Sequence, residues 1–164
     1  MESDLGIYFE PNCIYPHWGH LKLIRKLNES SCKHKFVYTK SRKFEYLKEL
    51  FPDDFEFIRM DIYGEDYFKF IRKCLEEVNI YKYSLHIYTG KENKNLEEFF
   101  RELYRDNPVK FTTIGLNNVN VSNFLFNFLQ KCKTFEGFYS EPLCYQNLTE
   151  DQAYLIWEIH KGRK

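Results

Sequence analysis

The sequence predicts an α/β fold: a doubly wound, mostly parallel sheet of five strands with helices on both faces. Short β-prone runs alternate with stretches in which apolar residues recur every three or four positions. Parallel strands need crossover helices, so about five such units around one core give this architecture. The 164 residues, 43% of them hydrophobic, predict a single domain over residues 1–164.

Each element has its own pattern. The β-prone runs are Leu5–Phe9, Phe36–Thr39, Phe55–Met60, Leu85–Thr89 and Lys110–Ile114, and helical spacing marks 65–78 and 96–103. A closing helix at about 149–161 starts at the cap residue Thr149, with Gln152 three positions later, and we expect it to pack as a lid or edge helix. Residues 11–16, 28–33 and 134–147 are predicted to be flexible loops.

Charge and cysteine usage exclude several classes of protein. Lys plus Arg and Asp plus Glu both number 24, which argues against a protein built to coat nucleic acid or an anionic membrane. The chain has no long apolar run, and its five cysteines show no CxxC spacing, so neither a disulfide framework nor a cysteine zinc site is supported. We therefore expect a cytoplasmic protein without a membrane or nucleic-acid partner, and a homo-oligomer is possible.

The most informative segment follows the first predicted strand and contains His17-Trp-Gly-His20 at the start of a helix. Histidines three residues apart lie on one face of a helix. The helix start attracts anions, and Gly19 lets a phosphate approach the backbone, so the imidazoles could stabilise charge during nucleotidyl transfer. The alternative is that both histidines face solvent and that Trp18 is a core anchor.

With this motif in this place, the sequence resembles the HxGH nucleotidyltransferase superfamily, which has a Rossmann-like fold. Its members transfer a nucleoside monophosphate from a nucleoside triphosphate to a phosphorylated small molecule and release pyrophosphate. The resemblance implies that His17 and His20 stabilise the α and β phosphates and that Phe9 and Gly19 belong to the nucleotide site. It also implies a Mg²⁺ ion that accompanies the triphosphate.

Weaker matches extend over nearly the whole chain and resemble compact nicotinamide-nucleotide adenylyltransferases. They imply a base pocket, an acceptor pocket and a site for the triphosphate tail at a helix capped by Ser122. The residues are, in that order, Thr89, Gly90 and Asn93; Asp61, Ile62 and Phe68; and Val121, Ser122 and Asn123. Adenylyl transfer from ATP to nicotinamide mononucleotide, as in NAD synthesis, is therefore favoured. Trp18 is instead typical of glycerol-phosphate cytidylyltransferases, so transfer from CTP is the alternative.

The chain also departs from the superfamily's pattern. Two usual arginine positions carry Tyr8 and, in the later motif, Leu125 or Phe126, and four residues, in a loop that includes Cys13, are inserted before His17. Bound phosphates need cations, and the candidates are Lys22, Lys40, Arg42 and Lys43. Arg42 is favoured because a guanidinium can bind two oxygens at once. The lost arginines leave a nucleotide-binding pseudoenzyme as a further alternative.

Overall fold

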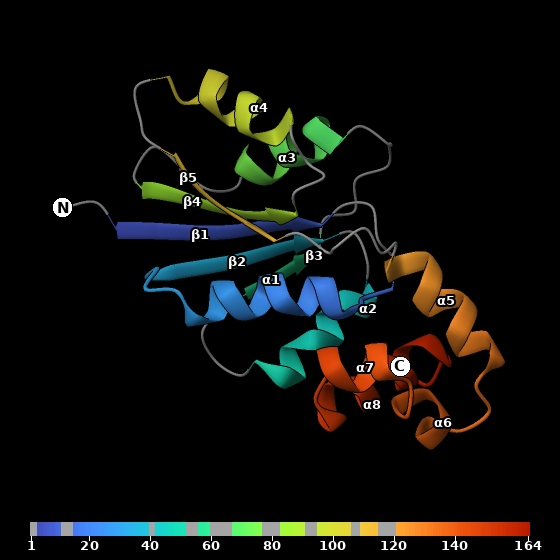
Figure 1. Cartoon of the computed structure of the whole chain (residues 1–164). Helices are drawn as coiled ribbons and strands as arrows, with labels where there is room; N and C mark the ends of the chain where they lie inside the picture. Colours follow the sequence, from blue (N-terminus) through green and yellow to red (C-terminus); the bar gives the residue numbers. More distant parts are fainter. Residues whose placement is uncertain are drawn as a thin grey trace.

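A computed structural model gives the architecture of the chain. It describes residues 3–10, 15–39, 42–51, 56–59, 67–76, 83–90, 95–105, 109–114 and 121–164. The strands are β1 (Ser3–Glu10), β2 (His34–Thr39), β3 (Glu56–Arg59), β4 (Tyr83–Gly90) and β5 (Val109–Ile114). They pair in the order β3-β2-β1-β4-β5, and every pair is parallel. The predicted α/β fold with a parallel sheet is confirmed (Figure 1).

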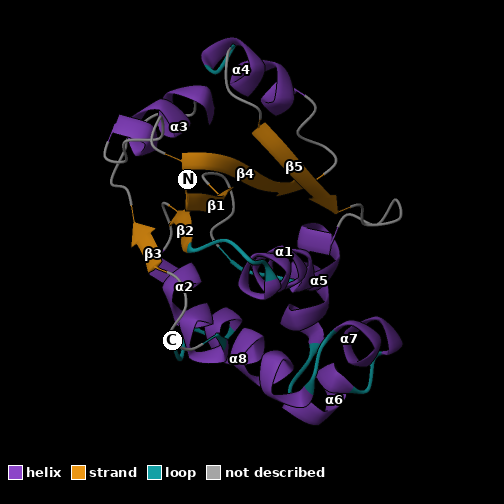
Figure 2. Cartoon of the chain, turned by 90° about the vertical axis from the view of Figure 1, so that its left-hand side faces the viewer, coloured by secondary structure: helices purple, strands orange, loops and turns teal. Residues whose placement is uncertain are grey.

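Helices cover both faces of the sheet. They are α1 (Trp18–Glu29), α2 (Arg42–Glu45), the 3-10 helix η1 (Tyr46–Leu50), α3 (Tyr67–Glu76), α4 (Asn95–Leu103), α5 (Val121–Lys131), α6 (Phe135–Tyr139), α7 (Pro142–Asn147) and α8 (Glu150–His160). Figure 2 shows α3 and α4 on one face and α1 and α2 on the other, with α6, α7 and α8 farther from the sheet beyond α1.

Alternating strand residues divide the buried side chains into two cores. Ile7 and Phe9 pack with α3 and α4, whereas Tyr8, between them, packs with α1 and the C-terminal helices. Val37 and Tyr88 lie on the same side as Tyr8. This two-sided burial is what a parallel sheet with crossover helices requires.

Gly6 lets helix α1 pack close to β1. A Cβ atom at Gly6 would lie 2.7 Å from Leu27 Cδ1 and 3.2 Å from Cys32 Sγ, closer than ordinary van der Waals contact. The missing side chain therefore allows the end of α1 to approach the strand, and α1 is the helix that carries the two histidines of the motif.

The C-terminal segment differs from two expectations. Residues 134–147, predicted as a flexible loop, form α6 and α7, in which Phe138 and Cys144 are buried. Helix α8 begins with the predicted capping box of Thr149 and Gln152, but it is neither a lid nor an edge helix. Its residues Ala153, Leu155, Ile156, Trp157 and Ile159 are buried, because α6 and α7 supply apolar side chains that pack against it.

Within the described part of the chain, no helix combines the length and the apolar composition that crossing a membrane requires.

Candidate functional site

Polar residues end three neighbouring strands at the carboxyl edge of the sheet. Glu10 and Thr39 are register partners at the ends of β1 and β2, and Thr89 precedes the last residue of β4. Thr39 and Thr89 are buried. The chain reverses its direction of travel across the sheet between β1 and β4, and ligands of open α/β sheets bind beyond the carboxyl ends of the strands at such a point. This edge is the candidate site.

Two histidines form the start of α1. His17 is the cap residue, and its Nδ1 accepts a hydrogen bond from the Gly19 N–H at 3.0 Å. The His17 N–H in turn donates to His20 Nδ1, also at 3.0 Å. This is a capping box built from imidazoles instead of the usual Ser or Thr with Glu or Gln. The two rings stack with their centroids 3.7 Å apart, so they share one face, as the spacing predicts.

The alternative in which these histidines face solvent is wrong. His17 is 8% exposed and His20 is 6% exposed, and the His20 ring meets the Phe44 ring edge-on at 4.8 Å. Trp18 is buried, as expected of a core anchor. The histidines are buried because α1 lies between the sheet and the C-terminal helices, an arrangement that the local sequence does not encode.

Both imidazoles are neutral at neutral pH. Burial lowers the pKa of His20 from 6.5 to about 3. Burial, with the nearby His20 and His160, lowers the pKa of His17 to about 2. Because each Nδ1 accepts a backbone N–H, the single proton of each neutral ring is on Nε2. The site therefore presents two Nε2–H donors without a positive charge.

A carboxylate lies beside these donors. Glu10 Oε2 is 3.7 Å from His20 Nε2 and accepts a hydrogen bond of 2.8 Å from the Tyr8 hydroxyl. Tyr8 and Glu10 thus form a hydrogen-bonded phenol–carboxylate pair at the end of β1. The sequence motifs do not single out Glu10, although it directly follows Phe9 at the end of a predicted strand.

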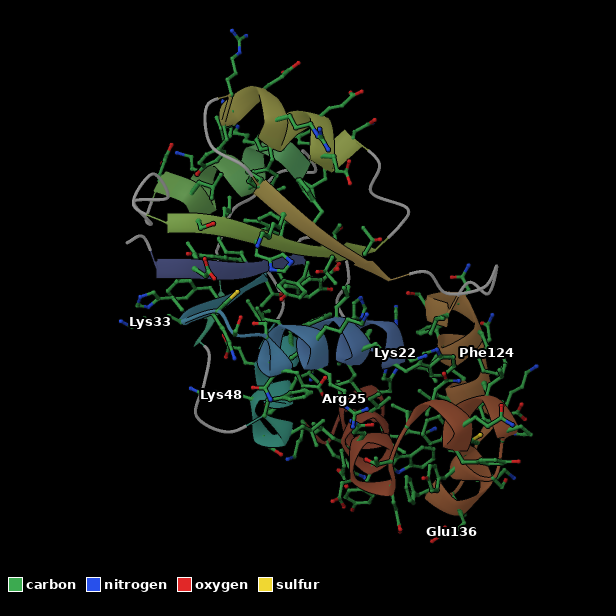
Figure 3. The ribbon with its side chains drawn as sticks, turned by 60° about the vertical axis from the view of Figure 1, so that its left-hand side comes forward. Lys22, Arg25, Lys33, Lys48, Phe124 and Glu136 are labelled. Atoms are coloured by element: carbon green, nitrogen blue, oxygen red, sulfur yellow. The ribbon has the colours of Figure 1, made fainter. Side chains whose placement is uncertain are left out.

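The start of α5 lies near the start of α1. The rings of Trp18 and Phe124 meet at an angle of 61° with centroids 6.1 Å apart (Figure 3, where Phe124 is labelled). Ser122 was predicted to cap this helix, but α5 begins at Val121, so Ser122 belongs to its first turn. Ser122 and Asn123 are exposed, whereas Val121 is buried in the core.

Other predicted site residues pack in the core on the α3 and α4 side. Phe9 stacks with Tyr38 and Phe100 at centroid distances of 5.7 and 6.0 Å. Phe68 packs against Phe99 at 4.9 Å. Thr89 and Gly90 are buried at the end of β4, where the Thr89 hydroxyl donates to the Gly90 carbonyl at 3.4 Å. The predicted residues Asp61, Ile62 and Asn93 lie outside the described residues, as does Cys13.

Two of the four candidate cations contact the C-terminal segment. Lys22 Nζ donates to Asn147 Oδ1 at 2.8 Å, and Lys43 Nζ donates to the carbonyl oxygen of Lys164. Arg42 begins α2, directly beyond the end of β2, but its side chain is not among those described, and Lys40 lies outside the described residues. The ammonium groups of Lys22 and Lys43 are thus both hydrogen-bonded to the C-terminal segment.

A cavity of about 470 Å³ lies elsewhere, between the end of α1 and the β4–β5 strands. Its lining includes Lys26, Ser30, His86 and Lys110, and none of the predicted site residues. Among the described residues, no group of three or more His, Cys, Asp or Glu side chains could hold a metal ion.

No protein-family model matches this chain, and no curated protein is significantly similar to it. Its function is therefore inferred from the chemistry of the site.

Proposed function

We propose that this protein is a nucleotidyltransferase of the HxGH type. It would transfer a nucleoside monophosphate from a nucleoside triphosphate to a phosphorylated small molecule and release pyrophosphate. The observation that carries the proposal is the pair of buried, neutral imidazoles of His17 and His20, stacked at the start of α1. Their backbone hydrogen bonds orient both rings before any substrate binds, which is the preorganisation that electrostatic catalysis requires.

The topology supports the same proposal. The order β3-β2-β1-β4-β5 agrees with a Rossmann-like sheet, in which nucleotides bind across the crevice where the strand order reverses. The histidines lie just beyond β1 at that point. The start of α5, with the exposed Ser122 and Asn123, lies near them and would receive the tail of the triphosphate.

The proposed chemistry needs no covalent enzyme intermediate. A phosphate oxygen of the acceptor attacks the α phosphorus, the bond from that phosphorus to the α–β bridging oxygen breaks, and pyrophosphate leaves with the electron pair. The Nε2–H groups of His17 and His20 donate to the α and β phosphate oxygens as negative charge develops there.

Magnesium would arrive as part of the Mg²⁺–triphosphate substrate. Protein-bound Mg²⁺ typically keeps one or two carboxylate ligands together with substrate phosphates, and Glu10 supplies a carboxylate beside His20. The ion would neutralise phosphate charge, which matters here because Tyr8 and Leu125 stand where the superfamily usually has arginines. Among substrates we favour ATP and nicotinamide mononucleotide, on the resemblance that extends along the chain.

One observation favours a second candidate, a nucleotide-binding pseudoenzyme. Leu125, at the place of the later arginine, is only 1% exposed, and both Lys22 and Lys43 hydrogen-bond to the C-terminal segment. With fewer cationic side chains to contact the phosphate oxygens, the site would stabilise the transition state of nucleotidyl transfer less. It could then bind a nucleotide without catalysing transfer.

Turnover distinguishes these candidates. ATP, CTP, GTP and UTP, each with Mg²⁺, are offered with nicotinamide mononucleotide or glycerol phosphate, and pyrophosphate release is measured. We expect release with ATP and nicotinamide mononucleotide. Release with CTP and glycerol phosphate would make the protein a cytidylyltransferase, whereas nucleotide binding without release from any pair would contradict catalysis and favour the pseudoenzyme.

Two variants test the role of the histidines. His17→Ser keeps a side-chain oxygen that can cap the helix, and His20→Ala removes the second imidazole. Each should lower kcat about a hundredfold to a thousandfold with little effect on triphosphate affinity, because the lost interaction forms mainly in the transition state. His86→Gln is the matched control, since His86 is a half-buried histidine at the separate cavity. An unchanged kcat in folded variants of both histidines would refute the mechanism.

A further inference from the structure

A third histidine reaches the candidate site from the far end of the chain. His160 is the last residue of α8, and its Nε2 lies 3.2 Å from the carbonyl oxygen of Pro16, 144 residues away in sequence. A carbonyl oxygen only accepts hydrogen bonds, so His160 Nε2 carries the proton and donates. The Tyr15 ring packs against the same imidazole with centroids 4.9 Å apart.

The Pro16 carbonyl belongs to the peptide group that also contains the His17 N–H. That N–H donates to His20 Nδ1 at 3.0 Å. One peptide group is therefore held at both ends, by His160 at its oxygen and by His20 at its N–H. The chain of hydrogen bonds runs from His160 Nε2 through this peptide group to His20 Nδ1.

Because the peptide group is rigid, the hydrogen bond from His160 to its oxygen affects the hydrogen bond from its N–H to His20. The peptide group is planar, so holding its oxygen also sets the direction of its N–H. A donor at the oxygen polarises the amide and strengthens donation by its N–H, since linked hydrogen bonds reinforce one another. Stronger donation to His20 Nδ1 favours the form of His20 that carries its proton on Nε2, where the ring faces Glu10.

Packing holds His160 in place. The adjacent Lys161 donates through Nζ to the carbonyls of Leu129 and Cys132, at 2.6 and 2.9 Å, and so ties the end of α8 to the end of α5. Trp157, one turn earlier, is buried in the core. The end of α8 that carries His160 is thus anchored to the C-terminal core, and the ring contacts Tyr15 and Pro16 from there.

We propose that His160 is a positioning residue: through the Pro16–His17 peptide group, it holds His20 in the Nε2–H form that donates to substrate. The kinetic part of this inference rests on the proposed nucleotidyl transfer. The structural part, the protonation form of His20, does not.

Nitrogen-15 NMR of the imidazoles distinguishes the Nε2–H form from the Nδ1–H form and does not require catalytic activity. In the unmodified protein we expect His20 and His160 both to carry the proton on Nε2. His160→Phe keeps a ring against Tyr15 but loses the donor, and it should convert His20 to a mixture of Nε2–H and Nδ1–H forms. His160→Gln restores an N–H donor and should restore the single form, and His86→Phe should leave His20 unchanged.

Kinetics supplies a second readout. His160→Phe should lower kcat about 10-fold, less than the roughly 100-fold loss typical of removing a direct donor, with KM for the triphosphate little changed. His160→Gln should recover most of that loss.

Two results would overturn the inference. One is a proton on Nδ1 of either His20 or His160 in the unmodified protein. This measurement does not depend on whether any variant folds. The other is a single Nε2–H form of His20 in folded His160→Phe. Absence of turnover together with the expected NMR changes would instead overturn only the proposed transferase activity.

Discussion

At the scale of single residues, His17 and His20 combine a structural role with the proposed chemical one. The Nδ1 atoms accept the backbone N–H groups of Gly19 and His17, so each neutral ring carries its proton on Nε2, the atom that we propose donates to substrate. Burial keeps both rings neutral. The cost of this arrangement is sensitivity to acid, because a protonated imidazole can no longer accept a hydrogen bond at Nδ1.

We therefore predict that acid destabilises the fold through these two residues. In the unfolded chain both histidines titrate near 6.5, whereas in the folded chain their pKa values are about 2 and about 3. Between about pH 3 and 6.5 the unfolded state binds more protons, so the free energy of unfolding falls as pH decreases through this window. The loss is about 2 kcal/mol per histidine at pH 5. Urea unfolding at neutral pH and at about pH 5 measures it.

The control replaces the imidazoles by an ordinary capping box. His17→Ser combined with His20→Gln keeps both capping hydrogen bonds and removes both titrating groups. Its stability should depend less steeply on pH, with the remaining slope due to groups such as His86 and His160, whose pKa values are also lowered by burial. A slope equal to that of the unmodified protein would contradict this account.

At the scale of elements, helix α5 places two adjacent residues in contrasting environments. Leu125 faces the C-terminal core and is 1% exposed, whereas the next residue, Phe126, is 48% exposed. One step along a helix turns a side chain by about 100°, so adjacent residues lie on different sides. An arginine in place of Leu125 would have to bury its charged side chain in the core that α5 forms with α8. The packing of this core therefore disfavours a cation at this position.

We predict that arginine destabilises the fold strongly at Leu125 and hardly at all at Phe126. Leu125→Arg should lower the free energy of unfolding by about 3–5 kcal/mol, because it removes buried apolar contacts and buries a charge. Phe126→Arg should change it by less than about 0.5 kcal/mol, as is usual for exposed positions. Chemical denaturation of the two variants provides the comparison, and equal stabilities would show that Leu125 is not a core residue in solution.

At the scale of the whole molecule, the C-terminal helices bind back onto the α/β body near the candidate site. Besides the His160 contact, Lys22 on α1 donates to Asn147, and Lys164 Nζ lies 2.9 and 2.8 Å from the two carboxylate oxygens of Glu49 (Figure 3, where Lys22 is labelled). A nucleotide bound at this site would therefore stabilise the folded chain as a whole.

We predict that ATP with Mg²⁺ raises the thermal unfolding midpoint and that CTP with Mg²⁺ does not. A ligand that binds only the folded state adds RT ln(1 + [L]/Kd), or about 2.7 kcal/mol at a concentration of 100 Kd. Differential scanning fluorimetry measures the midpoint, with Mg²⁺ alone as the control. A shift with CTP alone would favour the cytidylyltransferase alternative, and no shift with any nucleotide would contradict a nucleotide site.

Local patterns in the sequence predict most of the elements. The five β-prone runs are strands, the Thr149 and Gln152 pair starts α8, and the spacing of His17 and His20 puts both rings on one face. These features depend on relations between residues two to four positions apart, which the sequence displays directly. Residues 134–147 were predicted incorrectly because their Gly, Ser and Pro residues indicate turns, whereas the apolar residues among them are ordered by packing against α8.

The environment of the site follows from tertiary packing. The burial of His17 and His20, the hydrogen bond from Lys22 to Asn147 and the link from His160 to Pro16 have no counterpart in local sequence patterns. The last two join residues 125 and 144 positions apart. Hydrophobic burial of the C-terminal helices against α1 brings these groups together, and the same burial removes water from the imidazoles and lowers their pKa values.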